Sequence, residues 1–254
     1  MASVVTREIG ELLAGCAPGR LLEIPAGEMP VARALEPRGW RVVGLDLFPP
    51  AGAGRCVLAD ACAPLPFPAA TFDAVVSQEG IEHFENQAAF VRECARVLKP
   101  RGVLVLTTPN VLHLSARVSA FLTAQRVMKR GFLNEAHTLR ARNGSRIYHG
   151  HAFLIDAIRL RYLLALEGLA IDAVGRGRRS TGSILLGFLA PAVWLGTRLA
   201  LASGRRTLRR EGRPPVGAEV EAEVRRLANH PRLLFGRKLV LRARRRVDGR
   251  ASTG

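Results

Sequence analysis

Several classes of protein are excluded by what this 254-residue sequence lacks. No two cysteines form a C-x-x-C pair, so the sequence predicts neither a zinc-binding motif nor a disulfide framework. The beginning of the chain carries Glu8 and Glu11 and no continuous apolar core, so we expect no signal peptide. We interpret the four cysteines as reduced core residues of a cytosolic protein: Cys16, Cys56, Cys62 and Cys94.

The sequence also lacks an apolar run long enough to cross a membrane. A spanning helix needs about 20 predominantly apolar residues, but the most apolar stretch, 184–202, contains Pro191 and is interrupted at Thr197 and Arg198. Arginines flank it on both sides, which favours a segment that lies in a membrane interface over one that crosses. A lid helix or helical pair packed on the domain is the alternative. Our hypothesis is that the segment holds the protein at the cytoplasmic face of a membrane.

Acidic residues are scarce in the second half of the chain. Residues 1–125 hold 11 Lys/Arg and 12 Asp/Glu, whereas residues 126–254 hold 27 and 9, so the net charge of +17 comes from the second half. Such a basic surface attracts polyanions, and on charge alone nucleic acid and anionic lipid are equally suitable partners. The same half lacks aromatic residues interleaved with its basic ones, which weakens the case for stacking on nucleic-acid bases.

The turn after the first expected strand lacks the G-x-G-x-x-G pattern of dinucleotide-binding proteins. Instead, apolar residues lead into the small residues 25–27, where backbone N–H groups can approach a ligand. Glu23 and Glu28, in or beside this turn, would repel a phosphate, so a cationic cofactor without phosphates fits better. Asp46 follows nineteen positions after Gly27, close to the offset at which a second strand delivers an acid to ribose hydroxyls.

Strands alternate with helices along most of the chain. This order predicts an α/β fold with a Rossmann-like, doubly wound, mostly parallel sheet, and a ligand outside the carboxyl ends of its strands. We also expect an amphipathic lead-in helix around Leu12 and Leu13 and a last strand at 238–243. The other expected strands are 21–24, 41–46, 72–79, 103–110 and 169–174, and the expected helices are 31–35, 87–98 and 152–166.

Five motifs follow one another in the order of a single enzyme family. They are Glu23–Gly27, Asp46, Ala59–Ala61, Phe72–Glu79 and Leu98–Asn110. On these motifs the chain resembles the class I S-adenosylmethionine-dependent methyltransferases, a group that includes enzymes of quinone biosynthesis. The resemblance implies a seven-stranded sheet, in which 238–243 is an antiparallel closing strand, and S-adenosyl-L-methionine as cofactor. One position departs from the family pattern, because Met29 stands where a further glycine is usual.

The resemblance assigns cofactor contacts to the turn and to the ends of the strands. Asp46 would accept hydrogen bonds from two ribose hydroxyls. Glu23 would help to hold the methionine amino group, with capping of the next helix as its alternative, and Asp60 would meet the adenine edge, with a turn-capping role as its alternative. The full set of expected cofactor residues is Glu23, Ala26, Gly27, Asp46, Asp60, Ala61, Ser77 and Gln78.

Candidate catalytic groups come just after the fourth strand of this motif set. Of Glu79, Glu82 and His83, we expect Glu82 and His83 to be catalytic. His83 is the preferred general base, because histidine titrates near neutrality and this residue lies beyond the carboxyl end of the strand. Capping of the helix that begins near Asn86 is the alternative for both residues.

Acceptor contacts are expected from three further residues. Asn110 ends the fifth strand, with a turn role as its alternative, and His149 and His151 would face the same cavity from an insert. The spacing H-x-H is also a metal-ligand pattern, but the sequence shows no third ligand beside it, so we expect no metal site.

We expect one domain over residues 1–254. Its core would comprise 15–112, 151–175 and 236–246, and the inserts 113–150 and 176–235 would form helical additions on the substrate side that determine the acceptor. The second insert is both hydrophobic and basic.

The resemblance and the composition together imply S-adenosylmethionine-dependent methyl transfer to a hydroxyl or carbon of a small, hydrophobic or envelope-related acceptor. One alternative is an RNA methyltransferase that uses the basic half, although Ser77–Gly80 lacks the Asn/Asp-Pro-Pro-aromatic turn of exocyclic-amine enzymes. The other is a non-catalytic, membrane-associated scaffold, for which Met29 is the support. We expect a cytoplasmic protein in peripheral contact with an anionic membrane, and nucleic acid is the less favoured partner.

Overall fold

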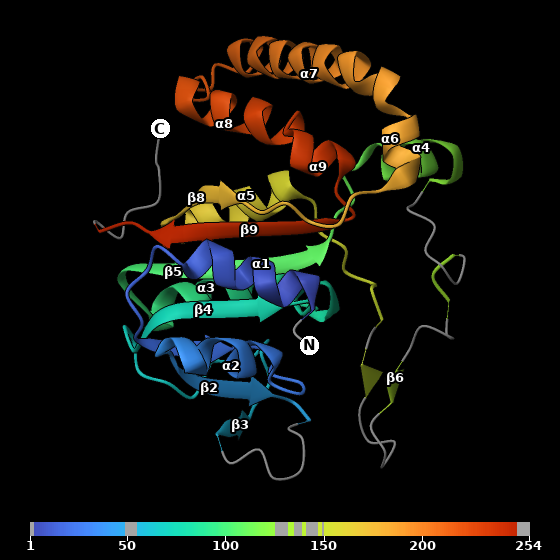
Figure 1. Ribbon diagram of the computed structural model, residues 1–254. Coiled ribbons are helices and arrows are strands. Elements are labelled where there is room, and N and C mark those ends of the chain that lie inside the picture. Colours follow the sequence, from blue (N-terminus) through green and yellow to red (C-terminus); the bar gives the residue numbers. More distant parts are fainter. Residues whose placement is uncertain are drawn as a thin grey trace.

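A seven-stranded sheet forms the centre of the protein. The computed structural model describes residues 3–48, 55–124, 132–134, 139–140, 147–148 and 150–247. The strands lie in the order β3-β2-β1-β4-β5-β9-β8 (Figure 1). Their bounds are β1 Arg20–Glu23, β2 Arg41–Asp46, β3 Cys56–Leu58, β4 Phe72–Gln78, β5 Leu98–Pro109, β8 Leu169–Val174 and β9 Lys238–Arg245.

The direction of the strands determines where a ligand can bind. Strands β1 to β5 pair in parallel, whereas β9 runs antiparallel between β5 and β8. This arrangement confirms the predicted Rossmann-like sheet with an antiparallel closing strand. The strand order reverses between β1 and β4, and ligands of such sheets bind at this switch point, outside the carboxyl ends of the strands.

Helices cover both faces of the sheet, because alternate residues of a buried strand point to opposite sides. Leu21 of β1 belongs to one apolar cluster, and the next residue, Leu22, belongs to the other. Figure 1 shows the first face under α1 and α2 and the second face behind the sheet, under α3 and α5. The bounds of these helices are α1 Val4–Leu13, α2 Pro30–Leu35, α3 Gln87–Val97 and α5 Ala157–Leu166.

The start of α5 differs from the prediction. The apolar periodicity placed it at residue 152, but the helix begins at Ala157. Asp156 explains the difference, because its Oδ1 accepts hydrogen bonds from the backbone N–H groups of Ile158 and Arg159. A side chain that caps the first turn in this way fixes the start of the helix. The residues before the cap therefore form a loop and not a helical turn.

The inserts contain most of the remaining helices. In the first insert, α4 (Leu114–Thr123) is followed by a two-stranded ribbon of β6 (Leu139–Arg140) and β7 (Ile147–Tyr148). The second insert contains α6 Thr181–Leu185, the short 3₁₀ turn η4 Gly187–Leu189, α7 Ala190–Arg210, α8 Ala218–Ala228 and α9 Pro231–Phe235. We call residues 181–235 the helical arm.

The apolar stretch 184–202 is divided between three elements of the helical arm. It includes the end of α6, the turn η4 and the first part of α7. None of the residues of α7 is buried, so this helix lies on the surface of the protein. Within the described residues, we find no helix with the length and apolarity that a membrane crossing requires.

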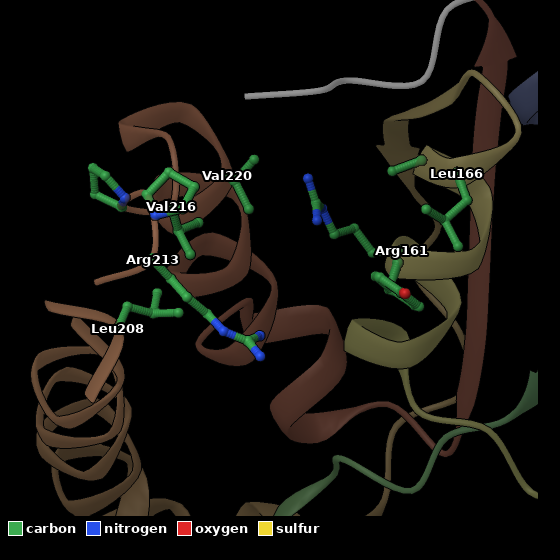
Figure 2. A pocket seen from close by; sticks show the side chains of 10 residues that line it. Arg161, Leu166, Leu208, Arg213, Val216 and Val220 are labelled. Atoms are coloured by element: carbon green, nitrogen blue, oxygen red, sulfur yellow. The ribbon is translucent and has the colours of Figure 1, made fainter. Parts of the chain in front are cut away.

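An ion pair ties the helical arm to the core helices. Arg161 of α5 donates to Glu223 of α8 at 2.7 Å, and both side chains are largely buried. Figure 2 shows the cavity of about 460 Å³ beside this pair, which is lined by residues of α5, the end of α7 and α8. Leu166, Leu208 and Val220 give it apolar walls.

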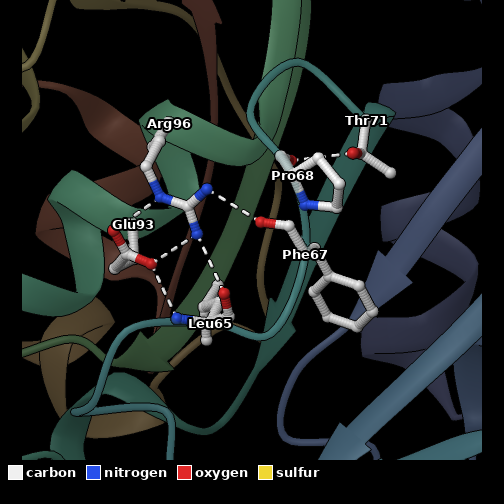
Figure 3. A network of polar contacts seen from close by, with 6 residues as sticks. All are labelled: Leu65, Phe67, Pro68, Thr71, Glu93 and Arg96. Atoms are coloured by element: carbon white, nitrogen blue, oxygen red, sulfur yellow. Dashed lines mark hydrogen bonds and ion pairs between the residues drawn. The ribbon is translucent and has the colours of Figure 1, made fainter.

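A half-buried fork of hydrogen bonds fixes the loop before β4 (Figure 3). Arg96 of α3 donates to the carbonyl oxygens of Leu65 and Phe67 at 2.9 and 2.8 Å, and it also pairs with Glu93. Glu93 in turn accepts from the backbone N–H of Leu65 at 2.6 Å. The hydrogen bond from Arg96 lowers the pKa of Glu93. This loop follows Asp60 and Ala61, so the fork holds one border of the expected cofactor site.

Replacing Arg96 by lysine is expected to destabilise the fold by about 2 kcal/mol, because a single ammonium group cannot reach two carbonyls and a carboxylate at once. Urea unfolding near neutral pH measures this difference. Since the folded state lowers the pKa of Glu93, its contribution is present above the unfolded pKa and is lost as the pH falls through the folded value. The difference in free energy of unfolding between wild type and the Arg96→Lys variant should therefore become smaller at acidic pH. Arg92→Lys is the control, because the Arg92 side chain is exposed and pairs with Glu167 at the surface.

Candidate functional site

Asp46 organises the turn between β1 and α2. Its Oδ2 accepts a hydrogen bond from the backbone N–H of Gly27 at 2.8 Å, and its Oδ1 accepts from that of Phe48 at 2.8 Å. The N–H of Ala26 donates to the carbonyl of Leu45, so the turn lies against the end of β2. Each carboxylate oxygen has a second lone pair. Asp46 can therefore hold the turn and still accept from a ligand hydroxyl.

Glu23 is completely buried and faces the start of α2. Its two carboxylate oxygens accept from the backbone N–H groups of Val31 and Ala32 at 2.9 and 2.8 Å. The structure thus gives Glu23 the capping role that was the alternative to a cofactor contact. Burial raises its pKa to about 7, although the two backbone hydrogen bonds act in the opposite direction. A cation that approached the turn would favour the ionised form.

Met29 occupies the position where the resemblance leads us to expect glycine. Its φ of 50° lies in the left-handed region, which glycine adopts without steric cost. The chain keeps this backbone shape with a methionine whose Cε would lie 3.2 Å from a Cβ placed on Gly44. The departure from the family pattern therefore leaves the geometry of the turn in place.

The other expected cofactor residues surround this turn. Asp60 accepts from the backbone N–H of Cys62 and so caps its own turn, and Ala61 is buried beside it. Ser77 is buried at the end of β4. Gln78 accepts a hydrogen bond from Thr6 of α1 at 3.3 Å, which places α1 over the end of β4.

Glu82 and His83 lie in a 3₁₀ turn, η2 (Ile81–His83), just beyond β4. Glu82 is completely buried, and one of its oxygens accepts from the hydroxyl of Thr108 on β5 at 2.9 Å. The rings of His83 and His151 are 5.0 Å apart between centroids. Ligand atoms of all three residues lie within 4.8 Å of one another, so the structure brings together two predicted catalytic residues and one predicted acceptor contact.

Backbone contacts hold His151 beside η2. The N–H of Phe153 donates to the carbonyl of Glu82 at 3.1 Å. The side-chain amide of Gln87 donates to the carbonyls of both Ile81 and Phe153, at 2.8 and 2.6 Å. The prediction of no metal site did not anticipate this arrangement of two histidines and a carboxylate, which has the donor types of a metal centre.

Glu79, the remaining acid of this region, binds groups on neighbouring strands. It has a left-handed φ of 53° and forms an ion pair with Lys238 at the start of β9. It also accepts from the hydroxyl of Thr107 at 3.0 Å. The pKa of Lys238 is lowered by its burial. Glu79 therefore joins β4, β5 and β9 and is a poor candidate for a base.

Asn110 makes its side-chain hydrogen bonds within the protein. Its amide nitrogen donates to the carbonyls of Leu233 and Gly236, both at 2.7 Å, and its oxygen accepts from the backbone N–H of Leu112. The side chain is buried, so the acceptor contact predicted for Asn110 is replaced by the turn role that was its alternative. His149, another predicted acceptor contact, lies outside the described residues.

Several residues of the site were missed in the sequence because their roles depend on tertiary contacts. Thr108 and Gln87 hold the catalytic candidates. Gln87 lies outside the five motifs, and Thr108 lies in the last of them but was not singled out. Gly80 lies where a Cβ atom would overlap with Cδ of Pro25, so the turns after β1 and β4 touch at this glycine. A glycine in one turn and a proline in another can indicate that two turns come into contact. This signal could be used only once the order of the strands was known.

Comparison with known proteins agrees with the fold and with the motifs. Residues 22–106 match a family model described as a methyltransferase domain. A probable S-adenosylmethionine-dependent methyltransferase of Mycolicibacterium smegmatis is 39% identical over 111 residues, which cover 39% of this chain and 42% of that protein. A ubiquinone biosynthesis O-methyltransferase of Parvibaculum lavamentivorans is 35% identical over 74 residues, which cover 29% of this chain and 28% of the relative.

The chain therefore spans less than half the length of either relative. Among solved structures, a SAM-dependent methyltransferase from Archaeoglobus fulgidus is similar with a TM-score of 0.52 and 14% identity, covering 95% of this chain and 93% of that one. A likeness at this identity supports the fold alone.

Proposed function

We propose that this chain, which belongs to the class I S-adenosylmethionine-dependent methyltransferases, transfers a methyl group to a hydroxyl or carbon of a small, hydrophobic or envelope-related acceptor. One observation carries the proposal. The turn held by Asp46 follows β1, and the cluster of Glu82, His83 and His151 adjoins the end of β4, the parallel neighbour of β1. A cofactor in the turn and an acceptor at the cluster would therefore meet at one edge of the sheet.

S-adenosylmethionine fits the residues of this edge. Its sulfonium and ammonium charges suit a turn that carries Glu23 and Glu28. Asp46 has acceptor capacity for ribose hydroxyls beyond its two backbone bonds. The hydroxyl of Ser77 is buried at the end of β4 and has no hydrogen-bond partner among the described residues, so a ligand at this edge could supply one.

The cofactor supplies an electrophilic methyl group, and the chain has to present the acceptor and remove its proton. In-line displacement depends chiefly on holding the two reactants in contact. His83 is the proposed base for the acceptor proton, with His151 beside it. The buried carboxylate of Glu82, fixed by Thr108, would favour the protonated imidazole that results.

The surface formed by α4 and the helical arm supports a hydrophobic acceptor and a peripheral membrane position. Four large side chains on neighbouring helices are 72–89% exposed, and α4 packs on α6. We call them the apolar shelf: Phe121 and Leu122 of α4, Leu185 of α6 and Phe188 of η4. Exposed apolar groups on a basic protein suit the surface of an anionic membrane. Neither alternative, RNA methylation or a scaffold, gains support from the relatives.

The proposal is tested by incubating the protein with S-adenosylmethionine that carries a labelled methyl group and with total membrane lipid from a source organism of the relatives. Enzyme-dependent label in the organic phase supports the proposal. Label that enters RNA instead, or no transfer by a protein that binds the cofactor, contradicts it.

The affinity for S-adenosylmethionine is expected to rise by up to about tenfold between pH 5.5 and pH 8, because a cationic ligand favours ionised Glu23. The pKa of Glu23 is about 7 in the free protein, so the gain is complete once the pH is above that value. Calorimetric titration across this pH range measures the effect. Glu23→Gln should flatten the dependence, and an unchanged slope in that variant would show that Glu23 acts only as a helix cap.

A further inference from the structure

A basic recess lies between the helical arm and the loop after β8, outside the proposed active site. It has a volume of about 690 Å³ and lies between the loop after β8, the helix α6 and the segment from α9 to β9. Arg176, Arg179 and Arg232 contribute three guanidinium groups to its lining. We call it the arginine recess.

The charge of the arginine recess is not neutralised by the protein. Within residues 150–247 and the other described parts, none of its three arginines forms an ion pair with a carboxylate, whereas Arg205, Arg213 and Arg242 on the same half do. Arg232 donates to the carbonyl of Val174, which fixes its position without reducing its charge.

Two neighbouring groups show the sign of the local field. Burial lowers the pKa of His230, and the charges of Arg232 and Arg226 lower it further. The carboxylate of Glu8 touches the border of the recess, where it accepts from the backbone N–H of Gly177. One carboxylate against three arginines leaves an excess of positive charge, which suits a phosphate group with its multiple acceptor oxygens.

The remaining walls of the recess are apolar and continue onto the surface. Ile184, Pro231 and Phe235 line it together with the arginines. Ile184 is followed on α6 by Leu185 of the apolar shelf, and Gly187 packs near the ring of Phe235. A ligand with a phosphate in the recess would thus place attached alkyl chains along the apolar shelf.

We propose that the arginine recess binds the phosphate of an anionic phospholipid and so anchors the protein on a membrane surface. This inference rests on the proposed peripheral position of the protein, to which it adds the residues and the ligand chemistry. Arginine forks match phosphate oxygens, and the apolar shelf matches the acyl region just below the headgroups. RNA would meet a single recess with an apolar wall, which suits a headgroup better than a continuous phosphate backbone.

The test measures sedimentation of the full chain with vesicles of phosphatidylcholine alone and with vesicles that also contain phosphatidylglycerol. Wild type should bind the second kind preferentially. The double variant Arg176→Gln/Arg179→Gln should lose about 25-fold in partition coefficient, or about fivefold for each arginine. The control Arg206→Gln/Arg209→Gln removes the same amount of charge near the C-terminal end of α7. Its partition coefficient should fall by no more than about threefold.

Equal losses of vesicle binding in the two double variants would overturn the proposal, because binding would then depend on the overall positive charge and not on the arginine recess. Absence of vesicle binding would overturn it as well. Calorimetry with inorganic phosphate and with a short RNA distinguishes the other sources, and binding of either without vesicle binding would assign the recess to a soluble ligand. The affinity of each variant for S-adenosylmethionine is measured separately, so a failed methyltransferase proposal and a failed lipid site give different results.

Discussion

Replacing His83 by alanine is expected to lower kcat for methyl transfer by about 100- to 1,000-fold, the usual contribution of a positioned general base. The Kd for S-adenosylmethionine should change by less than about twofold, because His83 lies beyond β4 and the cofactor turn follows β1. Single-turnover transfer from labelled cofactor, combined with calorimetric titration, separates the two quantities.

His230→Asn is the matched control for this variant. His230 accepts from the backbone N–H of Arg232 at the start of α9, and asparagine keeps such a capping acceptor. Activity of the control should equal that of wild type. If His83→Ala retains kcat within about threefold, the proton is removed by another group or no base is needed, and His83 has only a structural role beside His151.

Replacing Asp46 by alanine is expected to weaken S-adenosylmethionine binding by about 100-fold or more. Two charge-assisted hydrogen bonds to ribose hydroxyls would be lost, each worth about 1.5 kcal/mol or more. The backbone N–H of Gly27 would lose its acceptor as well, which loosens the turn. Titration with S-adenosylhomocysteine should show the same loss, because the ribose is common to both ligands.

Asp172→Ala is the control for the change of charge. Asp172 lies on β8, where it pairs with Arg242 and Arg244, and this strand is at the far end of the sheet from β2. Its replacement should leave cofactor affinity unchanged. If the Asp46→Ala protein is folded and binds the cofactor as tightly as wild type, the ribose does not bind at this edge of the sheet.

The sequence was sufficient to predict the sheet because its signals are local. Apolar runs identify the buried strands, and Pro100 and Gly102 interrupt the helix pattern after Leu98. The structure shows that β5 begins already at Leu98. The antiparallel β9 was predicted from strand order and family resemblance, although the helical arm separates it from β8 by more than 60 residues.

The roles of individual side chains were harder to predict, because they depend on which groups from distant parts of the chain the fold places beside them. Glu23 stands at the strand end where a cofactor contact is expected, yet the N–H groups of α2 come within hydrogen-bonding distance of both its oxygens. Asn110 stands at the end of β5, yet carbonyls from residues more than 120 positions later occupy its amide. Neither contact has a signature within a short window of sequence.

The grouping of His151 with Glu82 and the arginine recess illustrate the same limit. The H-x-H spacing pointed to His151, but its grouping with Glu82 and His83 became visible only in the structure, where Gln87 and Phe153 bring the segment against η2. The excess of basic residues in the second half was evident from composition, but composition does not tell which arginines lack a carboxylate partner. That distinction separates a specific recess from a generally basic surface.

Calorimetric titration of the full chain with S-adenosylmethionine and with S-adenosylhomocysteine shows whether the turn between β1 and α2 holds the cofactor. We expect a single site with a micromolar Kd for both ligands. If the folded protein binds neither ligand, the turn is not a cofactor site, and methionine at position 29 marks a turn that has lost its cofactor.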